Sequence, residues 1–265
     1  MGRLNLALLG GWVARVDGRA VVGFKSAKAR ALLAYLAVEA GLPHRREALA
    51  ALFWPEHPES GARANLSQAL FNLRSILGDR GAASSLPADS SPAGPALPFL
   101  LVQGEAIQFN AASDHGVDVA VLAAAVRACA EHGHAAGDEC DACLERLHEA
   151  AELYRGAFLQ DLAIEDSAAF EEWAAVQRER LHRLALEALQ RLAAAHERRG
   201  DYERGLAYAW RQVELDPWRE EGQRQLMRLL ALAGQRSAAL AQYEACRRAL
   251  AEELGAEPAT ETIAL

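Results

Sequence analysis

The stretch SAKARALLAYLAVEAGLPHRREALAALFWPEHPESGARANLSQALFNLRSILG, residues 26–78, decides the fold of the N-terminal part of this chain. Its apolar residues recur every three to four positions, the spacing that gathers them on one side of an α-helix. Breaks fall at Gly41 and at Trp54-Pro55, where helices commonly end. The spacing therefore predicts three helices, over residues 26–40, 44–53 and 61–77.

Short strands are predicted on both sides of these helices. Alternating apolar residues indicate strands near residues 4–8, 12–16 and 20–22, and a hairpin over residues 99–109 that turns at Gln103-Gly104-Glu105. The intervening residues 79–98 are rich in Ser, Pro, Gly and Ala, which predicts a flexible loop. Three helices followed by a hairpin make a winged helix-turn-helix, so residues 1–112 are predicted to form a DNA-binding domain of that type.

Residues 115–265 are predicted to form an α-helical domain. A shift of 34 residues superimposes Leu192 on Leu226 and Gly200 on Gly234, and 34 residues is the period of tetratricopeptide repeats. The predicted helices cover residues 117–131, 143–156, 167–199, 202–215, 219–233 and 236–253. The expected fold class is therefore mainly α with a small β component, a winged helix-turn-helix domain followed by a tetratricopeptide-like repeat domain.

Charge is divided unevenly along the 265 residues. The net charge of −8 combines +5 over residues 1–80 with −13 over the remainder. A basic N-terminal third is expected if that part binds a polyanion. The sequence has no apolar run of the ~18 residues that a transmembrane helix needs and no signal peptide, and its four cysteines fit a reducing compartment, so a cytoplasmic location is predicted.

The predicted helix over residues 61–77 has a polar face opposite its apolar stripe. Gln68 and Asn72, four residues apart, suit bidentate contact with adenine, while Ser67 and Ser75 suit bases or phosphates and Phe71 suits a thymine methyl. Basic residues nearby are expected to anchor phosphates. The candidate DNA-binding residues are Lys25, Lys28, Arg45, Arg46, Arg63, Asn65, Ser67, Gln68, Phe71, Asn72, Arg74 and Ser75. The alternative is that this face is only solvated, although an exposed phenylalanine argues for a partner.

A second group of residues has the composition of a metal site. Five donors fall within fifteen residues: Cys129, His132, His134, Cys140 and Cys143. Mixed Cys and His ligands suit tetrahedral Zn²⁺, and nothing indicates an open coordination position, so a structural Zn²⁺ is predicted. The alternative is that the cysteines are small core residues and the histidines are polar groups of a loop.

Enzymatic functions find no support in the sequence. It contains no Gly-rich phosphate loop and no Gly-x-Ser-x-Gly motif. Glu and Arg repeat along residues 167–199 as expected for surface ion pairs on a helix. The chain is therefore predicted not to be an enzyme.

Residues 26–78, with the hairpin that follows, resemble the DNA-binding half of bacterial antibiotic-regulatory activators of the SARP type. LYRGAFLQDL, residues 153–162, and the stretch that begins GDYERGLAYAWRQVELDP at residue 200 resemble the bacterial transcriptional activator domain that follows it in that family. The resemblance implies a sequence-specific transcriptional regulator, an activator that binds direct-repeat promoter DNA as a side-by-side dimer. It also implies that the helical repeats support dimer contacts and recruit RNA polymerase.

By this resemblance the recognition helix is residues 63–77 and the wing is residues 99–109. The chain departs from the family in its long loop at residues 79–98 and in Ser67 and Asn72, where relatives often have Arg. The family's last helix continues past Glu261-Thr262, so the chain is expected to be the N-terminal part of a longer polypeptide, with a short natural C-terminus as the alternative.

Two other functions stay open. A tetratricopeptide-type interaction scaffold would keep the winged domain only for dimerisation. A sensor would use a metal at residues 129–143 to set the angle between the two domains. Base-reading side chains on the polar helix face distinguish a DNA-binding regulator from the scaffold.

Overall fold

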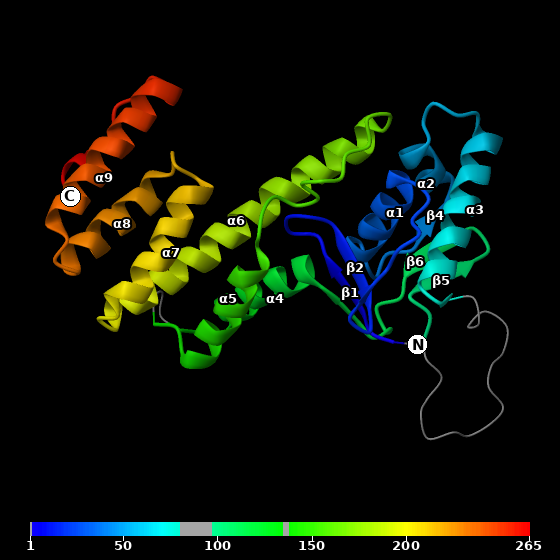
Figure 1. Cartoon of the computed structure of the whole chain (residues 1–265), viewed down its shortest axis with the longest axis horizontal. Helices are drawn as coiled ribbons and strands as arrows, with labels where there is room; N and C mark the ends of the chain where they lie inside the picture. Colours follow the sequence, from blue (N-terminus) through cyan, green and yellow to red (C-terminus); the bar gives the residue numbers. More distant parts are fainter. Residues whose placement is uncertain (1, 80–96, 135–137) are drawn as a thin grey trace. The chain divides into compact units, whose positions relative to one another are not determined.

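The structure is a computed structural model that describes residues 2–79, 97–134 and 138–265. It divides into an N-terminal unit, residues 1–121 with 153–181, and a C-terminal unit, residues 122–152 with 182–265 (Figure 1). Most of the predicted flexible loop, residues 80–96, lies outside the described residues. None of the helices in the described ranges is long and apolar enough to cross a membrane.

A small sheet opens the N-terminal unit. It contains β1 (Leu4–Ala7), β2 (Val13–Val16), β3 (Arg19–Ala20) and β7 (His115–Val117), in the order β3-β2-β1-β7. Asp17 and Gly18 join β2 to β3 with φ of 50° and 77°, the left-handed conformation of tight hairpin turns. The strands up to β3 match the prediction in place, whereas β7, which pairs in parallel with β1, was not predicted.

The predicted three helices are confirmed as α1 (Ala27–Val38), α2 (Arg46–Phe53) and α3 (Glu59–Ile76). Ser26 accepts a hydrogen bond from the backbone N–H of Ala29 and so caps α1. Buried side chains from all three helices form the core of this unit, among them Leu32, Leu33, Leu36, Leu49, Phe53, Leu66 and Leu73. This packing leaves one side of α3 at the surface.

The hairpin after α3 is confirmed as β5 (Leu100–Gln103) and β6 (Ala106–Phe109), and β6 also pairs with the unpredicted two-residue strand β4 (His44–Arg45). The buried carboxylate of Asp79 accepts the backbone N–H groups of Phe99 and Leu100, at 3.0 and 2.9 Å. Asp79 therefore joins the end of α3 directly to the start of the wing. Burial raises the pKa of Asp79, although those two hydrogen bonds and the charge of Arg74 oppose the shift.

The segment Leu153–Leu181 belongs to the N-terminal unit, whereas the sequence analysis predicted that it is part of the α-helical domain over residues 115–265. Aromatic packing explains the difference: Phe170 lies 5.3 Å from Phe53 and Trp173 lies 4.8 Å from Tyr35, measured between ring centroids. Leu9 and Phe158 also form a β-bridge. These apolar contacts join residues more than a hundred positions apart, and local periodicity does not reveal them.

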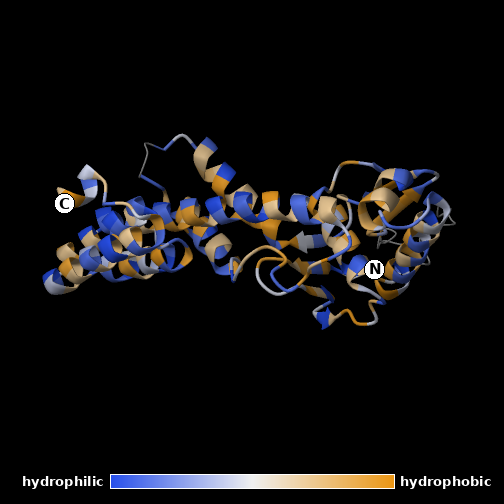
Figure 2. Cartoon of the chain, turned by 90° about the horizontal axis from the view of Figure 1, so that it is seen from above, coloured by the Kyte–Doolittle hydropathy of each residue, from blue (hydrophilic) through white to orange (hydrophobic). Residues whose placement is uncertain are grey.

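The predicted C-terminal helices are confirmed with ends that differ by a few residues. They are α4 (Asp118–Glu131), α5 (Asp141–Leu153), α6 (Ala168–Arg198), α7 (Tyr202–Leu215), α8 (Glu220–Leu232) and α9 (Arg236–Ala249), followed by a π-helical turn (Leu250–Leu254) and α10 (Thr260–Ile263). Each of α7, α8 and α9 packs on the next, and Figure 2 shows hydrophilic and hydrophobic residues alternating along them. A Cβ on Gly205 would lie only 3.0 Å from a methyl of Leu229, so a larger residue here would force Leu229 to shift at the contact of α7 with α8.

Buried glutamine side chains form hydrogen bonds between these helices. The side-chain amide of Gln212 donates to Gln225, whose amide donates to the carbonyl of Gln190. Gln242 donates to Gln223, which donates to the carbonyl of Pro217. The amide ladder, formed by Gln212, Gln223, Gln225 and Gln242, runs beside an apolar core that includes Leu206, Leu226, Leu229 and Leu230.

Candidate nucleic-acid interface

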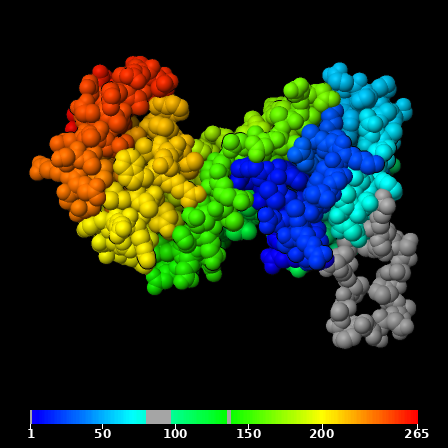
Figure 3. Space-filling model, viewed as in Figure 1, coloured from blue at the N-terminus to red at the C-terminus, as the bar shows by residue number. Residues whose placement is uncertain are grey.

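The exposed face of α3 has the shape and chemistry of a DNA-reading helix. Ser67, Gln68, Phe71 and Ser75 are exposed, and the side chain of Phe71 is 60% accessible. These positions recur at helical spacing and form one stripe, the α3 stripe, and Figure 3 shows α3 in cyan at the surface of the N-terminal unit. A single helix fits the major groove, where serine and glutamine side chains can hydrogen-bond base edges.

Asn72 does not belong to the α3 stripe, contrary to the sequence interpretation. It is 6% exposed, its amide donates to the carbonyl of Gly23 at 3.1 Å, and its oxygen accepts the backbone N–H of Lys25 at 3.2 Å. Asn72 thus fastens the segment before α1 to the side of α3. The prediction that Gln68 and Asn72 together contact adenine is therefore wrong, because Gln68 is exposed to solvent whereas Asn72 is buried.

The basic residues that stay available lie near α3 and the wing. Lys25 and Arg45 are exposed, and Arg63 is half-buried between carboxylates, 3.1 Å from Glu59 and 3.9 Å from Glu105. Arg46 donates from Nε to the carbonyl of Gly104 at 2.9 Å. These ion pairs involve exposed carboxylates and contribute little to stability, so phosphate can compete for the arginines.

Lys28 already has a carboxylate partner within the N-terminal unit, which competes with any phosphate. Its ammonium lies 2.6 Å from Asp166 and 5.6 Å from the ring centroid of Trp54, and its side chain is 15% exposed. The hydrogen bond from Lys28 lowers the pKa of Asp166 and outweighs desolvation. Arg74 is half-buried near Asp79, so it too is directed into the fold, while Asn65 is half-exposed at the side of α3.

The wing tip adds groups that the sequence interpretation did not single out. The backbone N–H of Arg46 donates to the carbonyl of Glu105 at 2.8 Å, and the Arg46 side chain also reaches Ser67 at 3.5 Å. Arg46 therefore connects the start of α2, the wing tip and the α3 stripe. No local sequence signal pointed to this link, because it depends on the pairing of β4 with β6.

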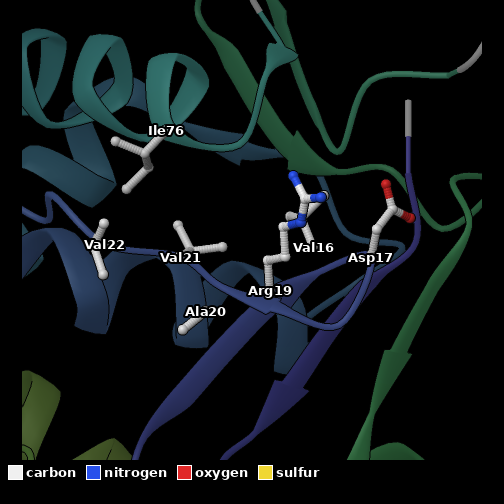
Figure 4. A pocket seen from close by; sticks show the side chains of 7 residues that line it. All are labelled: Val16, Asp17, Arg19, Ala20, Val21, Val22 and Ile76. Atoms are coloured by element: carbon white, nitrogen blue, oxygen red, sulfur yellow. The ribbon is translucent and has the colours of Figure 1, made fainter.

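A hollow of about 560 Å³ lies beside the C-terminal end of α3 (Figure 4). Val21, Val22 and Ile76 line it with short aliphatic side chains, and Asp17 and Arg19 supply its charged groups. A small-molecule site normally has several polar groups directed at one point. This hollow has no such convergence in its lining, so we assign it no ligand.

The Cys/His cluster lies at the junction of α4 and α5. His132 and His134 follow α4, Cys140 precedes α5 and Cys143 lies in its first turn. One donor atom from each lies within 4.8 Å of the others. The fifth candidate, Cys129, is outside this group: its buried thiol donates to the backbone carbonyl of Cys143 at 3.5 Å. Burial, with side-chain hydrogen bonding between the Cys143 thiol and Cys129 and Cys140, raises the pKa of Cys143 to about 12.

Comparison with known proteins agrees with this architecture. The family model described as the bacterial transcriptional activator domain matches residues 117–265. The Transcriptional regulatory protein EmbR of Mycobacterium tuberculosis is 29% identical over 263 residues, which are 97% of this chain and 60% of that protein, and the protein of the same name from Mycobacterium bovis matches equally.

A solved structure, Mycobacterium tuberculosis EmbR in complex with low affinity phosphopeptide, matches with a TM-score of 0.72 and 27% identity. The match covers 100% of this chain and 64% of that one, so the chain spans somewhat less than two thirds of these relatives. It confirms the predicted fold class of a winged-helix domain followed by a tetratricopeptide-like domain. With more than half of its residues matched by the family model, the chain belongs to the family of bacterial transcriptional activator domain proteins, as its resemblance to SARP-type regulators predicted.

Proposed function

We propose that this chain is a sequence-specific DNA-binding transcriptional activator that inserts α3 into the major groove of promoter DNA. The observation that carries the proposal is the α3 stripe, an exposed row of Ser67, Gln68, Phe71 and Ser75 next to a wing and to exposed basic residues. A groove about 12 Å wide admits one helix and presents a distinct hydrogen-bonding pattern for each base pair. Family membership makes transcriptional control the natural use of this surface.

Each part of the N-terminal unit has a separate role in this proposal. Gln68 reads a base, with Ser67 and Ser75 beside it, and Phe71 meets a thymine methyl or a sugar. Lys25, Arg45, Arg46 and Arg63 hold phosphates. The wing tip at Gly104 and Glu105 lies against Arg46 and sets how far that side chain reaches.

The acidic C-terminal helices take the remaining roles in our proposal. Residues 81–265 carry −13, a charge that disfavours contact with DNA and suits contact with proteins. We propose that they contact RNA polymerase and a second copy of the chain, so that two copies occupy a direct repeat in the cytoplasm. The proposed activity is binding, without catalysis.

Selection of DNA sequences tests the proposal. Duplexes with a randomised segment are enriched on the purified chain and sequenced, and affinities for the enriched and a scrambled duplex are measured at several salt concentrations, because phosphate contacts make affinity salt-dependent. We expect a direct-repeat motif and tighter binding of the enriched duplex.

Substitution of Gln68 then links sequence preference to the α3 stripe. Loss of one base contact costs about 1–3 kcal/mol of discrimination, so Gln68→Ala should reduce the preference for the enriched duplex by about 5–150-fold. Gln235→Ala is the matched control, since Gln235 is exposed in the C-terminal unit. Equal binding of enriched and scrambled duplexes by the unmodified chain would refute the proposal and favour the interaction scaffold.

A further inference from the structure

The Cys/His cluster has the interatomic distances of an assembled tetrahedral metal site. In a site with Zn–S of about 2.3 Å and Zn–N of about 2.0–2.1 Å, adjacent N and S ligands lie about 3.5 Å apart and two N ligands about 3.4 Å apart. His132 Nδ1 lies 3.2 Å from Cys143 Sγ and 3.7 Å from Cys140 Sγ, while His134 Nε2 lies 3.5 Å from Cys143 Sγ and 3.1 Å from His132 Nδ1. These four of the six donor pairs are within a few tenths of an ångström of the expected ligand separation, and the other two pairs lie within 4.8 Å.

Four donors complete a tetrahedron and leave no position for a substrate. Two thiolates and two imidazoles match the preference of Zn²⁺ and differ from the oxygen ligands that Mg²⁺ and Ca²⁺ prefer. The geometry also decides among the five sequence candidates, because Cys129 hydrogen-bonds the Cys143 carbonyl and is not part of the donor group. We propose that His132, His134, Cys140 and Cys143 bind one structural Zn²⁺ that joins the end of α4 to the start of α5.

Neighbouring residues hold the ligands in place. Arg198 pairs with the buried carboxylate of Glu139 at 3.0 Å, and Arg199 pairs with Asp141 at 2.7 Å and donates to the Glu139 carbonyl. Arg198 is the last residue of α6 and Arg199 follows it, so Cys140 lies between two residues that pair with the end of this helix.

The backbone also brings the two thiols together. The N–H groups of Cys143 and Leu144 donate to the Cys140 carbonyl, which places both cysteines at the start of α5. The ion itself would join α4 and α5 across the residues that separate His134 from Cys140.

Cobalt titration of the purified chain tests the site. With a reductant present and metal removed, Co²⁺ should bind in a 1:1 ratio and give the visible absorption of tetrahedral cobalt with a near-ultraviolet thiolate band. One equivalent of Zn²⁺ should abolish both. Zn²⁺ at a hundredfold excess over its Kd should also raise the unfolding temperature of the C-terminal unit by about 5–10 °C.

Variants show which residues bind the ion. His134→Asn and Cys140→Ser alter side chains that are partly accessible, so we expect both variants to fold, as circular dichroism can check, and to lose more than about 100-fold in Co²⁺ affinity. Cys129→Ala is the matched control and should keep the 1:1 spectrum, as should His148→Asn on the same helix as Cys143.

Three results would overturn the proposal. The first is no cobalt spectrum in the fully reduced chain. The second is a spectrum that persists in both His134→Asn and Cys140→Ser. The third is loss of the spectrum in Cys129→Ala while that variant stays folded. DNA binding is measured in a separate experiment with duplexes. A failed cobalt titration therefore does not refute the DNA-binding proposal, and absence of DNA binding does not refute the metal site.

Discussion

Asn72→Ala should destabilise the N-terminal unit without removing a base contact. The side chain makes two hydrogen bonds, one to the Gly23 carbonyl and one from the Lys25 N–H. Gly23 and Lys25 are exposed residues, so water can replace the lost partner at each group. The net cost is then about 0.5–1.5 kcal/mol per bond, and we expect the free energy of unfolding to fall by about 1–3 kcal/mol.

Chemical denaturation followed by tryptophan fluorescence measures this loss, and Asn65→Ala on the same helix is the control because Asn65 is half-exposed. Asn65→Ala should change the free energy of unfolding by less than about 0.5 kcal/mol. Below its unfolding transition, Asn72→Ala should keep the same ranking of DNA sequences. Unchanged stability together with lost preference at one base pair would refute our assignment and restore Asn72 as a base-reading residue.

Three further predictions follow from the same contacts. When DNA affinity is measured at several salt concentrations, Arg45→Ala should reduce the magnitude of the slope of log affinity against log salt concentration by about 0.9. Lys28→Ala should change this slope far less, because the ammonium of Lys28 pairs with Asp166. Burial lowers the pKa of His196 below its ordinary 6.5, against the opposing charge of Asp201. As the pH falls, the unfolded chain therefore protonates His196 before the folded chain does, so the free energy of unfolding of the C-terminal unit should fall as the pH drops below 6.5. Denaturation curves measured at a series of pH values test this: His196→Gln should weaken the dependence of stability on pH below 6.5. An unchanged dependence in His196→Gln would contradict the prediction. Replacing residues 80–96 by six Gly/Ser residues should change the free energy of unfolding by only about 1 kcal/mol and preserve DNA affinity. The reason is that Asp79 accepts the backbone N–H groups of Phe99 and Leu100 and so connects α3 to the wing. Loss of the unfolding transition in calorimetry would show that Asp79 alone does not hold the wing in place.

Helices were predictable here because their signals are local. The 3.6-residue period and the glycines at 200 and 234, which adopt φ of 73° and 78°, mark where the C-terminal helices end. Strands β4 and β7 have two and three residues, too few for alternation to appear, and both depend on distant partners. Local periodicity therefore predicted the helices and missed these two short strands.

The candidate sites were predictable as groups of residues but not as final sets. A helical wheel places Asn72 beside Gln68, yet the segment at residues 23–25 covers one of them and leaves the other exposed. Lys28 looked like a phosphate anchor because its partner Asp166 is 138 positions away. Similarly, the spacing in the sequence predicted five metal ligands. Cys129 is left out of that set only because its thiol donates a hydrogen bond to the Cys143 carbonyl in the structure.

The amide ladder has a consequence for the register in which these helices stack. Apolar faces of stacked helices are nearly interchangeable, so a helix displaced along its neighbour would lose little buried apolar area. A buried glutamine is less tolerant, because a helix displaced by one residue turns about 100° and leaves its amide without a partner. Gln212, Gln223, Gln225 and Gln242 are each at most 9% exposed, so any misaligned helix would bury several unpaired polar groups at once. The ladder thus acts as a register check, and it disfavours any stacking of these helices that is out of register.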